Sequence, residues 1–229
     1  MKLSILIPAY NESKTILGII KRIQNVDLGE IEKELIIIDD FSTDGTREIL
    51  KSMEDDKIKV LFSEKNFGKG HSIVKGMNFA TGDLIIIQDA DFEYNPDDYP
   101  KLLRPILDGR TNVVYGSRFL GNNQIPKTKF YFGNKFLSLL TSVLYFSKIT
   151  DMETCYKVFK REIVKGMKIK SKRFGLEPEL TSKILNRGNK IIEIPISYNP
   201  RSVLQGKKIK PIDGLKAILT LFIFRFSKN

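Results

Sequence analysis

Cysteine, histidine and tryptophan are almost missing from this sequence. Its 229 residues include one cysteine, Cys155, one histidine, His71, and no tryptophan. A lone cysteine excludes a disulfide framework and any cysteine-rich zinc site, and this usage is typical of proteins in the reducing interior of the cell. We therefore expect a cytoplasmic protein that folds around a hydrophobic core, for which its 41% of hydrophobic residues suffice.

Long apolar runs are missing as well. Residues 3–7 are apolar except for Ser4 and end at Pro8, which makes the run too short for the core of a signal peptide or for a membrane span. The run at 136–146 is interrupted by hydroxyl side chains and is also too short to cross a bilayer. We expect helices over 134–147 and 213–226 that either pack on the core or lie in a membrane interface.

Acidic residues are scarce in the second half of the chain. Residues 1–110 carry 15 Lys and Arg against 20 Asp and Glu, whereas residues 111–229 carry 23 against 7. The formal net charge of +11 therefore comes from the second half alone. A basic half of this kind suits an anionic membrane surface or a phosphorylated substrate.

The first half alternates short β-branched runs with segments of helical period. Strands are predicted at 3–7, 35–39, 58–62, 84–88 and 113–115, and helices near 12–26, 44–55, 69–80 and 97–108. Such strands pair in parallel through right-handed crossovers and form an open α/β sheet covered on both faces. Ligands of these sheets bind at the carboxyl ends of the strands, so polar residues there are the first candidates for a site.

Two aspartates follow the fourth predicted strand. Asp89 and Asp91 are spaced i, i+2, and Glu93 offers a third oxygen ligand. Carboxylates at a strand end can hold Mg²⁺ or Mn²⁺, whose open coordination positions accept a diphosphate. Taken alone, such a pair is more often two solvated loop residues, and it is the acids at other strand ends that favour a metal site.

Two other segments carry polar groups at similar places. Asp39 ends the second predicted strand, where its carboxylate could accept hydrogen bonds from a nucleobase or a ribose, whereas Asp44 better fits a helix cap. Lys69 stands between two glycines at the start of a helix, a place where backbone N–H groups and the ammonium meet phosphate. This segment fits neither the P-loop pattern nor the dinucleotide-binding fingerprint.

A series of short motifs extends over nearly the whole chain. In order, they are Pro8-Ala9-Tyr10-Asn11-Glu12, Ile38-Asp39-Asp40, Gly68-Lys69-Gly70, Asp89-Ala90-Asp91, Gly116-Ser117-Arg118, Thr150-Asp151-Met152-Glu153-Thr154-Cys155-Tyr156, Leu176-Glu177-Pro178-Glu179-Leu180 and Ile194-Pro195. This series resembles family 2 glycosyltransferases with the GT-A fold. Within the family it is most similar to the polyprenyl-phosphate sugar synthases typified by dolichyl-phosphate mannosyltransferase.

The resemblance implies a fold and a division of the chain. It implies one GT-A domain over residues 1–229, an α/β fold with an open mixed, mostly parallel sheet, helices on both faces and C-terminal amphipathic helices. Residues 1–116 would form the half that binds a nucleotide sugar. Residues 117–229 would form a basic half that binds the acceptor and contacts the membrane.

The resemblance also implies the residues of the site. The nucleotide pocket matches Pro8, Tyr10, Glu12, Ile37 and Asp39, and Lys69 joins it at the phosphates. The metal and diphosphate site matches Asp89, Ala90 and Asp91, with Glu93 as a metal ligand where this group often has glutamine. Arg118 matches an arginine on the diphosphate or the acceptor phosphate, and Arg201 with Lys207 or Lys208 matches a basic loop that closes over the donor.

The implied reaction is an inverting transfer of a hexose. A nucleotide diphosphate sugar loses its diphosphate, and Mg²⁺ or Mn²⁺ at Asp91, together with Lys69 and Arg118, stabilises the charge that develops on it. A polyprenyl phosphate acceptor (dolichyl or undecaprenyl) is already ionised and needs no general base. If the acceptor is instead a hydroxyl group, Glu177 is the candidate base, as in relatives that use UDP-sugars to assemble polysaccharides or glycolipids.

Three other classes fit less well. A processive polysaccharide synthase needs membrane spans and a Gln-x-x-Arg-Trp motif, but the chain has no tryptophan. A sugar-nucleotide pyrophosphorylase has a glycine-rich loop where this chain has Pro8-Ala9-Tyr10. A nucleic-acid-binding module explains the net charge but not the acids at successive strand ends. We therefore expect a peripheral enzyme on the cytoplasmic face of a membrane, with GDP-mannose as the favoured donor and a UDP-hexose as the other one.

Overall fold

A seven-stranded sheet runs through the middle of the protein in the order β3-β2-β1-β4-β6-β5-β7, counted in the part of the chain that is described. The computed structural model describes residues 1–227 except 54, 172, 174 and 201–210. The strands are β1 (Lys2–Ala9), β2 (Glu32–Asp39), β3 (Ile58–Phe62), β4 (Leu84–Ile87), β5 (Val113–Ser117), β6 (Lys157–Lys160) and β7 (Ile191–Pro195). β6 is antiparallel to β4 and β5, and the other neighbouring pairs are parallel. The predicted mixed, mostly parallel sheet is confirmed.

The central strands are buried on both faces. In β1, Leu6 pairs with Ile36 of β2 on one side and with Ile87 of β4 on the other, and none of the three is more than 2% exposed. A strand that is covered on both faces has a continuous run of apolar residues rather than an alternating pattern. The β-branched segments of the first half have such runs. This burial fixes the register and therefore the places where the strands end.

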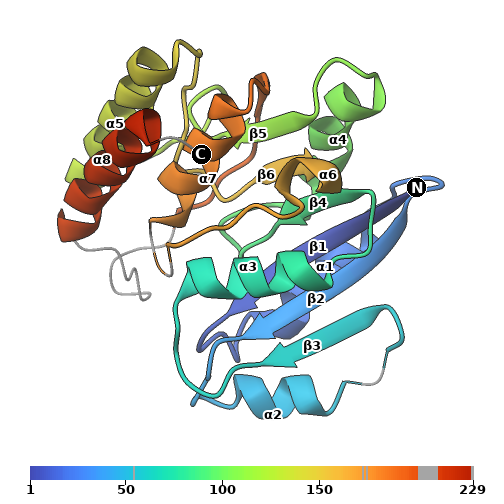
Figure 1. Cartoon of the computed structure of the whole chain (residues 1–229). Helices are drawn as coiled ribbons and strands as arrows, with labels where there is room; N and C mark the ends of the chain where they lie inside the picture. The colour runs from blue at the N-terminus through green and yellow to red at the C-terminus, as the bar shows by residue number, and fades with distance from the viewer. Residues whose placement is uncertain (54, 172, 174, 201–210, 228–229) are drawn as a thin grey trace.

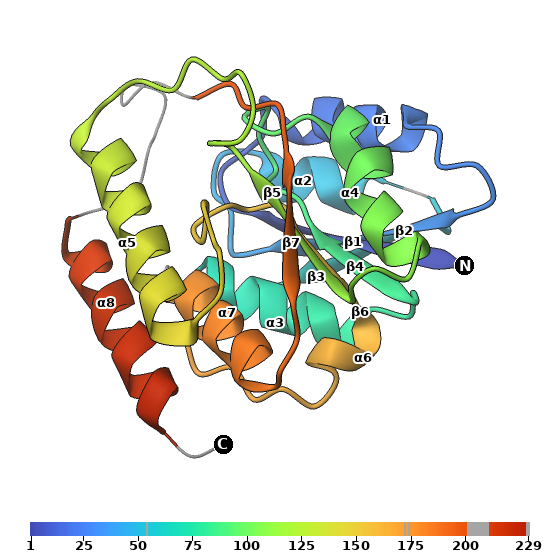
Figure 2. The ribbon, with the colours of Figure 1, turned by 90° about the horizontal axis from the view of Figure 1, so that it is seen from above.

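Helices cover both faces of the sheet. They are α1 (Ile16–Asn25), α2 (Thr46–Lys51), α3 (Lys69–Phe79), α4 (Tyr99–Leu107), α5 (Lys129–Tyr145), α6 (Arg161–Val164), α7 (Leu176–Asn186) and α8 (Pro211–Phe226), with a 3-10 turn, η1 (Pro96–Asp98), before α4. Figure 2 shows α1 and α4 over one face and α3 and α7 over the other. In α1 the buried residues recur at helical spacing, Ile16, Ile19, Ile20 and Ile23, which gives this helix one face for the core.

The helices α5 and α8 lie side by side beyond the sheet (Figures 1 and 2). The hydroxyl of Tyr145 donates to the carbonyl oxygen of Leu221 at 2.8 Å and links the two. Each also carries an exposed apolar stripe: Phe132, Phe136, Leu139 and Val143 on α5, and Ile212, Leu215, Leu219, Phe222, Ile223 and Phe226 on α8. In the described part of the chain, no helix is long and apolar enough to cross a membrane.

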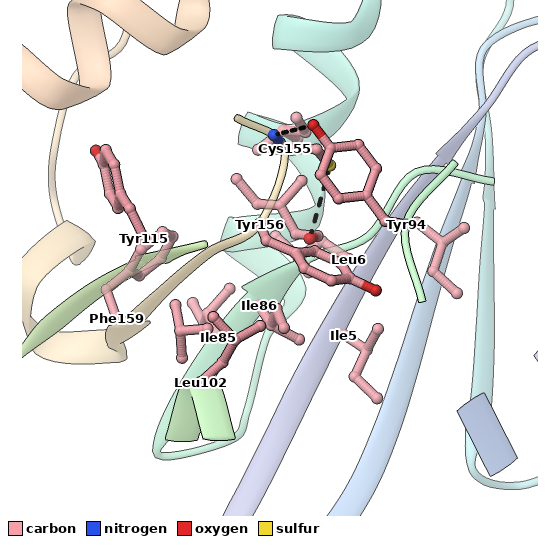
Figure 3. Packing of buried hydrophobic residues seen from close by; sticks show 14 of the residues in the cluster. Ile5, Leu6, Ile85, Ile86, Tyr94, Leu102, Tyr115, Cys155, Tyr156 and Phe159 are labelled. Atoms are coloured by element: carbon pink, nitrogen blue, oxygen red, sulfur yellow. Dashed lines mark hydrogen bonds between the residues drawn. The ribbon is translucent and has the colours of Figure 1, made fainter. Parts of the chain in front are cut away.

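An aromatic cluster supports the loop before β6. The hydroxyls of Tyr99 and Tyr156 both donate to Oε1 of Gln88, at 2.7 and 2.8 Å. The backbone N–H of Cys155 donates to the hydroxyl oxygen of Tyr94 at 3.1 Å, and Figure 3 shows this bond above the isoleucines of β4. Hydrogen bonds between buried polar groups fix one arrangement of a core, so these bonds hold the loop in a defined position at the end of β4.

Candidate active site

One cavity of about 600 Å³ opens where the carboxyl ends of β1, β4 and β5 meet. Its walls come from the segments that follow these strands, from the start of α3 and from α7. The first turns of α5 and α8 close the other side, with Lys129 and Phe130 from α5 and Asp213 and Gly214 from α8. The cavity therefore joins the mildly acidic first half of the chain to its basic second half.

The acidic turn after β4 forms part of this wall. Asp89, Asp91 and Glu93 all line the cavity, and Asp91 is only 3% exposed. The turn is held in place because Oδ1 of Asp91 accepts the N–H of Glu93 at 2.9 Å and the carbonyl of Glu93 accepts the N–H of Asn199 at 2.9 Å. The Tyr198 hydroxyl adds a contact of 3.3 Å to Oε1 of Glu93.

Oxygen ligands of this kind suit Mg²⁺ or Mn²⁺. Among the residues that the structure describes, no three His, Cys, Asp or Glu side chains gather into a complete metal cluster. A cation bound here would therefore take one or two carboxylates from Asp89, Asp91 or Glu93 and its remaining oxygens from a ligand, which is how Mg²⁺ commonly binds beside a diphosphate.

A lysine lies against the first of these acids. Nζ of Lys69, the first residue of α3, is 2.6 Å from Oδ1 of Asp89 and 3.9 Å from Oε1 of Glu177. Burial by itself lowers the pKa of Lys69, but the carboxylates of Asp89 and Glu177 outweigh burial and raise this pKa well above its usual value. The ammonium is therefore a permanent positive charge in the cavity wall.

The two glutamates of α7 have different surroundings. The Glu179 carboxylate accepts the N–H groups of Lys170 and Ser171 at 2.8 and 2.7 Å, and Nζ of Lys183 at 2.5 Å. Burial raises the pKa of Glu179, but these hydrogen bonds outweigh burial and lower it. Glu177 lines the cavity, and its Oε2 is buried without a hydrogen-bond partner. Glu179 thus anchors a neighbouring segment, whereas Glu177 offers an oxygen to the cavity.

A buried ion pair fixes the arginine after β5. Nε and Nη2 of Arg118 each donate to a carboxylate oxygen of Asp151 at 2.7 Å. The backbone N–H groups of Thr150 and Asp151 donate in turn to Glu193 of β7 at 2.7 and 2.9 Å. Bidentate pairing sets the plane of the guanidinium, so Arg118 lines the cavity in one orientation.

Several cavity residues were not predicted from the sequence, and Glu153 is one of them. It lines the cavity from the loop between Asp151 and β6, and its Oε1 is buried without a hydrogen-bond partner. Burial, reinforced by the charge of Glu177, raises the pKa of Glu153 to about 8. The signal that could have revealed it is an acid in a loop that leads into a strand, but β6 itself was not predicted.

The structure brings most of the predicted site residues to the same cavity. The lining includes Pro8, Tyr10, Glu12, Lys69, Asp89, Ala90, Asp91, Glu93, Arg118 and Glu177. Ile37 and Asp39 are fully buried and are not part of the lining. Their neighbour Asp40 does line it, and its carboxylate accepts the N–H groups of Phe67 and Gly68 at 2.9 and 2.7 Å. Arg201, Lys207 and Lys208 lie outside the described residues.

Asp39 is held beneath the pocket rather than on its surface. Its Oδ1 accepts the N–H of Ser42 at 3.2 Å, and its Oδ2 is 3.7 Å from Nη1 of Arg47 and has no hydrogen-bond partner. In the sheet, Asp39 is paired with Ala9 of β1, at the last position of both strands. Its carboxylate therefore supports the turn that carries Asp40.

Comparisons with known proteins agree with this geometry. Residues 4–167 match the family model described as glycosyl transferase family 2. The chain is 28% identical over 220 residues to a dolichol-phosphate mannosyltransferase of Pyrococcus furiosus, covering 91% of this chain and 61% of that protein. The chain thus spans about three fifths of the length of this relative.

Two further proteins are similar over a larger part of their length. A UDP-N-acetylglucosamine–dolichyl-phosphate N-acetylglucosaminyltransferase of Methanococcus voltae is 29% identical, and the match covers 98% of this chain and 96% of that one. A solved structure of glucosyl-3-phosphoglycerate synthase from Mycobacterium tuberculosis, in complex with Mn²⁺, UDP and phosphoglyceric acid, has a TM-score of 0.75 at 19% identity. That match covers 100% of this chain and 80% of the solved one and shows the shared fold.

Proposed function

The chain belongs to glycosyl transferase family 2, and we propose that it moves a hexose from a nucleotide diphosphate sugar to polyprenyl phosphate with inversion at the anomeric carbon. The observation that carries the proposal is a single cavity that presents acids, a lysine and an arginine from several strand ends and also reaches α5 and α8. The relatives from Pyrococcus furiosus and Methanococcus voltae, both named for dolichyl phosphate, support the choice of acceptor.

The acidic turn and Lys69 serve the donor in this proposal. Asp89, Asp91 and Glu93 would hold Mg²⁺ or Mn²⁺, which neutralises the diphosphate when it is bound. The permanently charged Lys69 next to Asp89 adds a second positive group at the leaving diphosphate. The Mn²⁺ and UDP in the solved structure with the same fold support this assignment.

The nucleoside is assigned to the opposite end of the same wall. Pro8, Tyr10 and Glu12 follow β1 and line the cavity, and Asp40 lines it from the turn after β2. We assign the base and ribose to this corner, with Ile37 and Asp39 supporting it from beneath. The basic loop with Arg201, Lys207 and Lys208 remains part of the proposed donor site.

The acceptor phosphate is assigned to the cations of the second half. Arg118, Lys129 and Arg173 line the cavity there. A phosphate monoester is already anionic at neutral pH, so these residues need only position its oxygen against the anomeric carbon. Glu177 keeps one alternative open, because a hydroxyl acceptor requires a base and Glu177 offers a buried oxygen with no hydrogen-bond partner.

We propose that the exposed apolar stripes of α5 and α8 contact a membrane surface. An amphipathic helix lies in the interface when its apolar face is buried among lipids and basic residues flank it. Lys135 and Lys148 lie within and after α5, and Lys216 and Arg225 lie on α8. Such a position would bring the cavity to the headgroup of a lipid acceptor, on the cytoplasmic face where nucleotide sugars are found.

Transfer of label from donor to lipid tests the proposal. Purified chain is incubated with polyprenyl phosphate and radiolabelled GDP-mannose, UDP-N-acetylglucosamine or UDP-glucose, with Mn²⁺, with Mg²⁺ or with EDTA. We expect label in the organic phase that is acid-labile and requires the cation, and the active donor identifies the sugar, with mannose favoured. Donor turnover that leaves no label in lipid would contradict the lipid acceptor and support the hydroxyl alternative.

A further inference from the structure

Glu153 has a fixed backbone and a carboxyl oxygen with no hydrogen-bond partner. Nζ of Lys157 donates to the carbonyl oxygens of Met152 and Thr154, one on each side of Glu153. Tyr94 holds the next peptide through the N–H of Cys155. The side chain lines the cavity, where Oε1 is buried. A buried oxygen without a hydrogen-bond partner is costly, so this position calls for a ligand.

The charged groups around Glu153 leave it without a counter-ion. Glu177 faces it from α7, Lys157 from β6, Arg118 from the end of β5 and Asp151 from its own loop. Arg118 donates two hydrogen bonds to Asp151, and Lys157 donates hydrogen bonds to backbone carbonyl oxygens. Among the described residues, Glu153 forms no ion pair of its own. A carboxyl group in such surroundings is more stable as the neutral acid than as a charged carboxylate.

We propose that Glu153 binds substrate as a neutral carboxylic acid, donating a hydrogen bond to an anionic phosphate oxygen in the cavity. A neutral carboxyl group has an O–H donor, whereas a carboxylate only accepts and would repel phosphate. The inference rests on the proposed function, because that function is what brings phosphates to this cavity. The phosphate belongs either to the donor or to the lipid acceptor, and both offer the same oxygen chemistry.

The titration of Glu153 agrees with this role. Burial and the charge of Glu177 raise the pKa of Glu153 to about 8, against the opposing charges of Lys157 and Arg118. At neutral pH the side chain is therefore mostly protonated and able to donate. Above about pH 8 it ionises, and the hydrogen bond to phosphate is replaced by repulsion.

Two variants distinguish a neutral carboxylic acid at Glu153 from a charged carboxylate. Glu153→Gln keeps a donor and cannot ionise, whereas Glu153→Ala removes the donor. We expect kcat/KM of the wild type to fall above about pH 8, and that of Glu153→Gln to stay within about threefold of the wild type at pH 7 without this fall. Glu153→Ala loses roughly tenfold or more at pH 7, the usual cost of a hydrogen bond to a charged group. Equal losses in both variants, or a fall that persists in Glu153→Gln, would overturn the proposal.

Binding measurements identify which phosphate is contacted. Calorimetry at pH 7 with UDP, GDP and a short-chain polyprenyl phosphate is run on the wild type, Glu153→Ala and the control Glu162→Gln, an exposed residue of α6. Glu153→Ala should weaken the binding of either the nucleoside diphosphates or the polyprenyl phosphate. The control variant should bind both as tightly as the wild type does. If Glu153→Ala binds every probe as tightly as the wild type, the inference is wrong. If the wild type binds UDP or GDP but transfers nothing to polyprenyl phosphate, it is the proposed function that fails, and the nucleotide arm still tests Glu153.

Discussion

The two regions joined by the cavity are built in opposite ways. Residues 1–116 bury continuous isoleucine runs in parallel strands and place acids at the strand ends. Residues 117–227 are rich in lysine and arginine, and two of their helices, α5 and α8, carry exposed apolar stripes. A water-soluble donor fits a rigid polar rim, whereas an anionic lipid fits a basic region with apolar helices. The contrast therefore matches one region to each proposed substrate.

The largest expected effect is the loss of metal-dependent donor binding in the first region. Asp91→Asn should lower turnover by roughly 100- to 1,000-fold and abolish Mn²⁺-dependent donor binding, because a metal site supplies several kcal/mol to the departing diphosphate. The asparagine can still accept the N–H of Glu93, so the melting temperature should stay close to that of the wild type. Normal turnover with an intact fold would contradict the proposed metal site.

The second effect is on stability and tests the ion pair inside the second region. Asp151→Ala leaves the buried Arg118 guanidinium without its carboxylate and should lower the free energy of unfolding by about 3–5 kcal/mol. The matched control is Asp108→Ala, which breaks an exposed pair with Arg104 and should cost no more than about 1 kcal/mol. Chemical denaturation measures both, and equal costs would show that the buried pair does not hold Arg118.

The third effect, measured with two variants, is on the affinity of the second region for lipid. Leu139→Glu and Ile223→Glu replace exposed residues of the two apolar stripes, so each should leave stability within about 0.5 kcal/mol. Vesicle sedimentation with anionic lipids should show binding weakened by roughly 10- to 100-fold, since burying such a side chain contributes about 1.5–3 kcal/mol. Leu17→Glu on α1, at a similar exposure, is the control and should bind as the wild type does. Equal binding by all three would place the stripes away from the membrane.

The last effect is a gradual one, a slope of stability against pH. Burial raises the pKa values of Glu153 and Glu193, so the folded protein binds protons that the unfolded chain has already released. Stability should therefore fall as pH rises from about 4.5 to about 8, and Glu153→Gln should make that slope shallower. Urea unfolding across this range measures it, and an unchanged slope in the variant would contradict the raised pKa of Glu153.

The sequence allowed a better prediction of the first region than of the second. The short β-branched apolar runs predicted five strands, and the acids after several of them predicted the cavity wall, because parallel strands end at the same edge of a sheet. β6 was missed because it has only four residues, with lysine at both ends, and pairs with β4 some 70 positions away in sequence, as Ile86 does with Val158. Glu153 was missed with it, since its position depends on that strand.

Other details depended on contacts that no sequence pattern contains. Glu177 and Glu179 are two residues apart in one motif, and only the N–H groups of Lys170 and Ser171 show that Glu179 is an anchor. Asp39 was predicted for the pocket because its strand ends there, and Ile37 because it matches the nucleotide pocket of the family, but both are fully buried and neither lines the cavity. The end of a strand can thus be predicted from the sequence, whereas which of its last residues lines the cavity cannot.

The dependence of donor cleavage on the acceptor's charge tests directly whether the acceptor is an anionic lipid. Release of nucleoside diphosphate is measured with Mn²⁺ and the active donor in the presence of polyprenyl phosphate, of the matching polyprenol, or of neither. We expect rapid release with polyprenyl phosphate and only slow hydrolysis in the other two reactions. Equal release with polyprenol would show that the acceptor is a hydroxyl group and that the basic region does not select an anionic lipid.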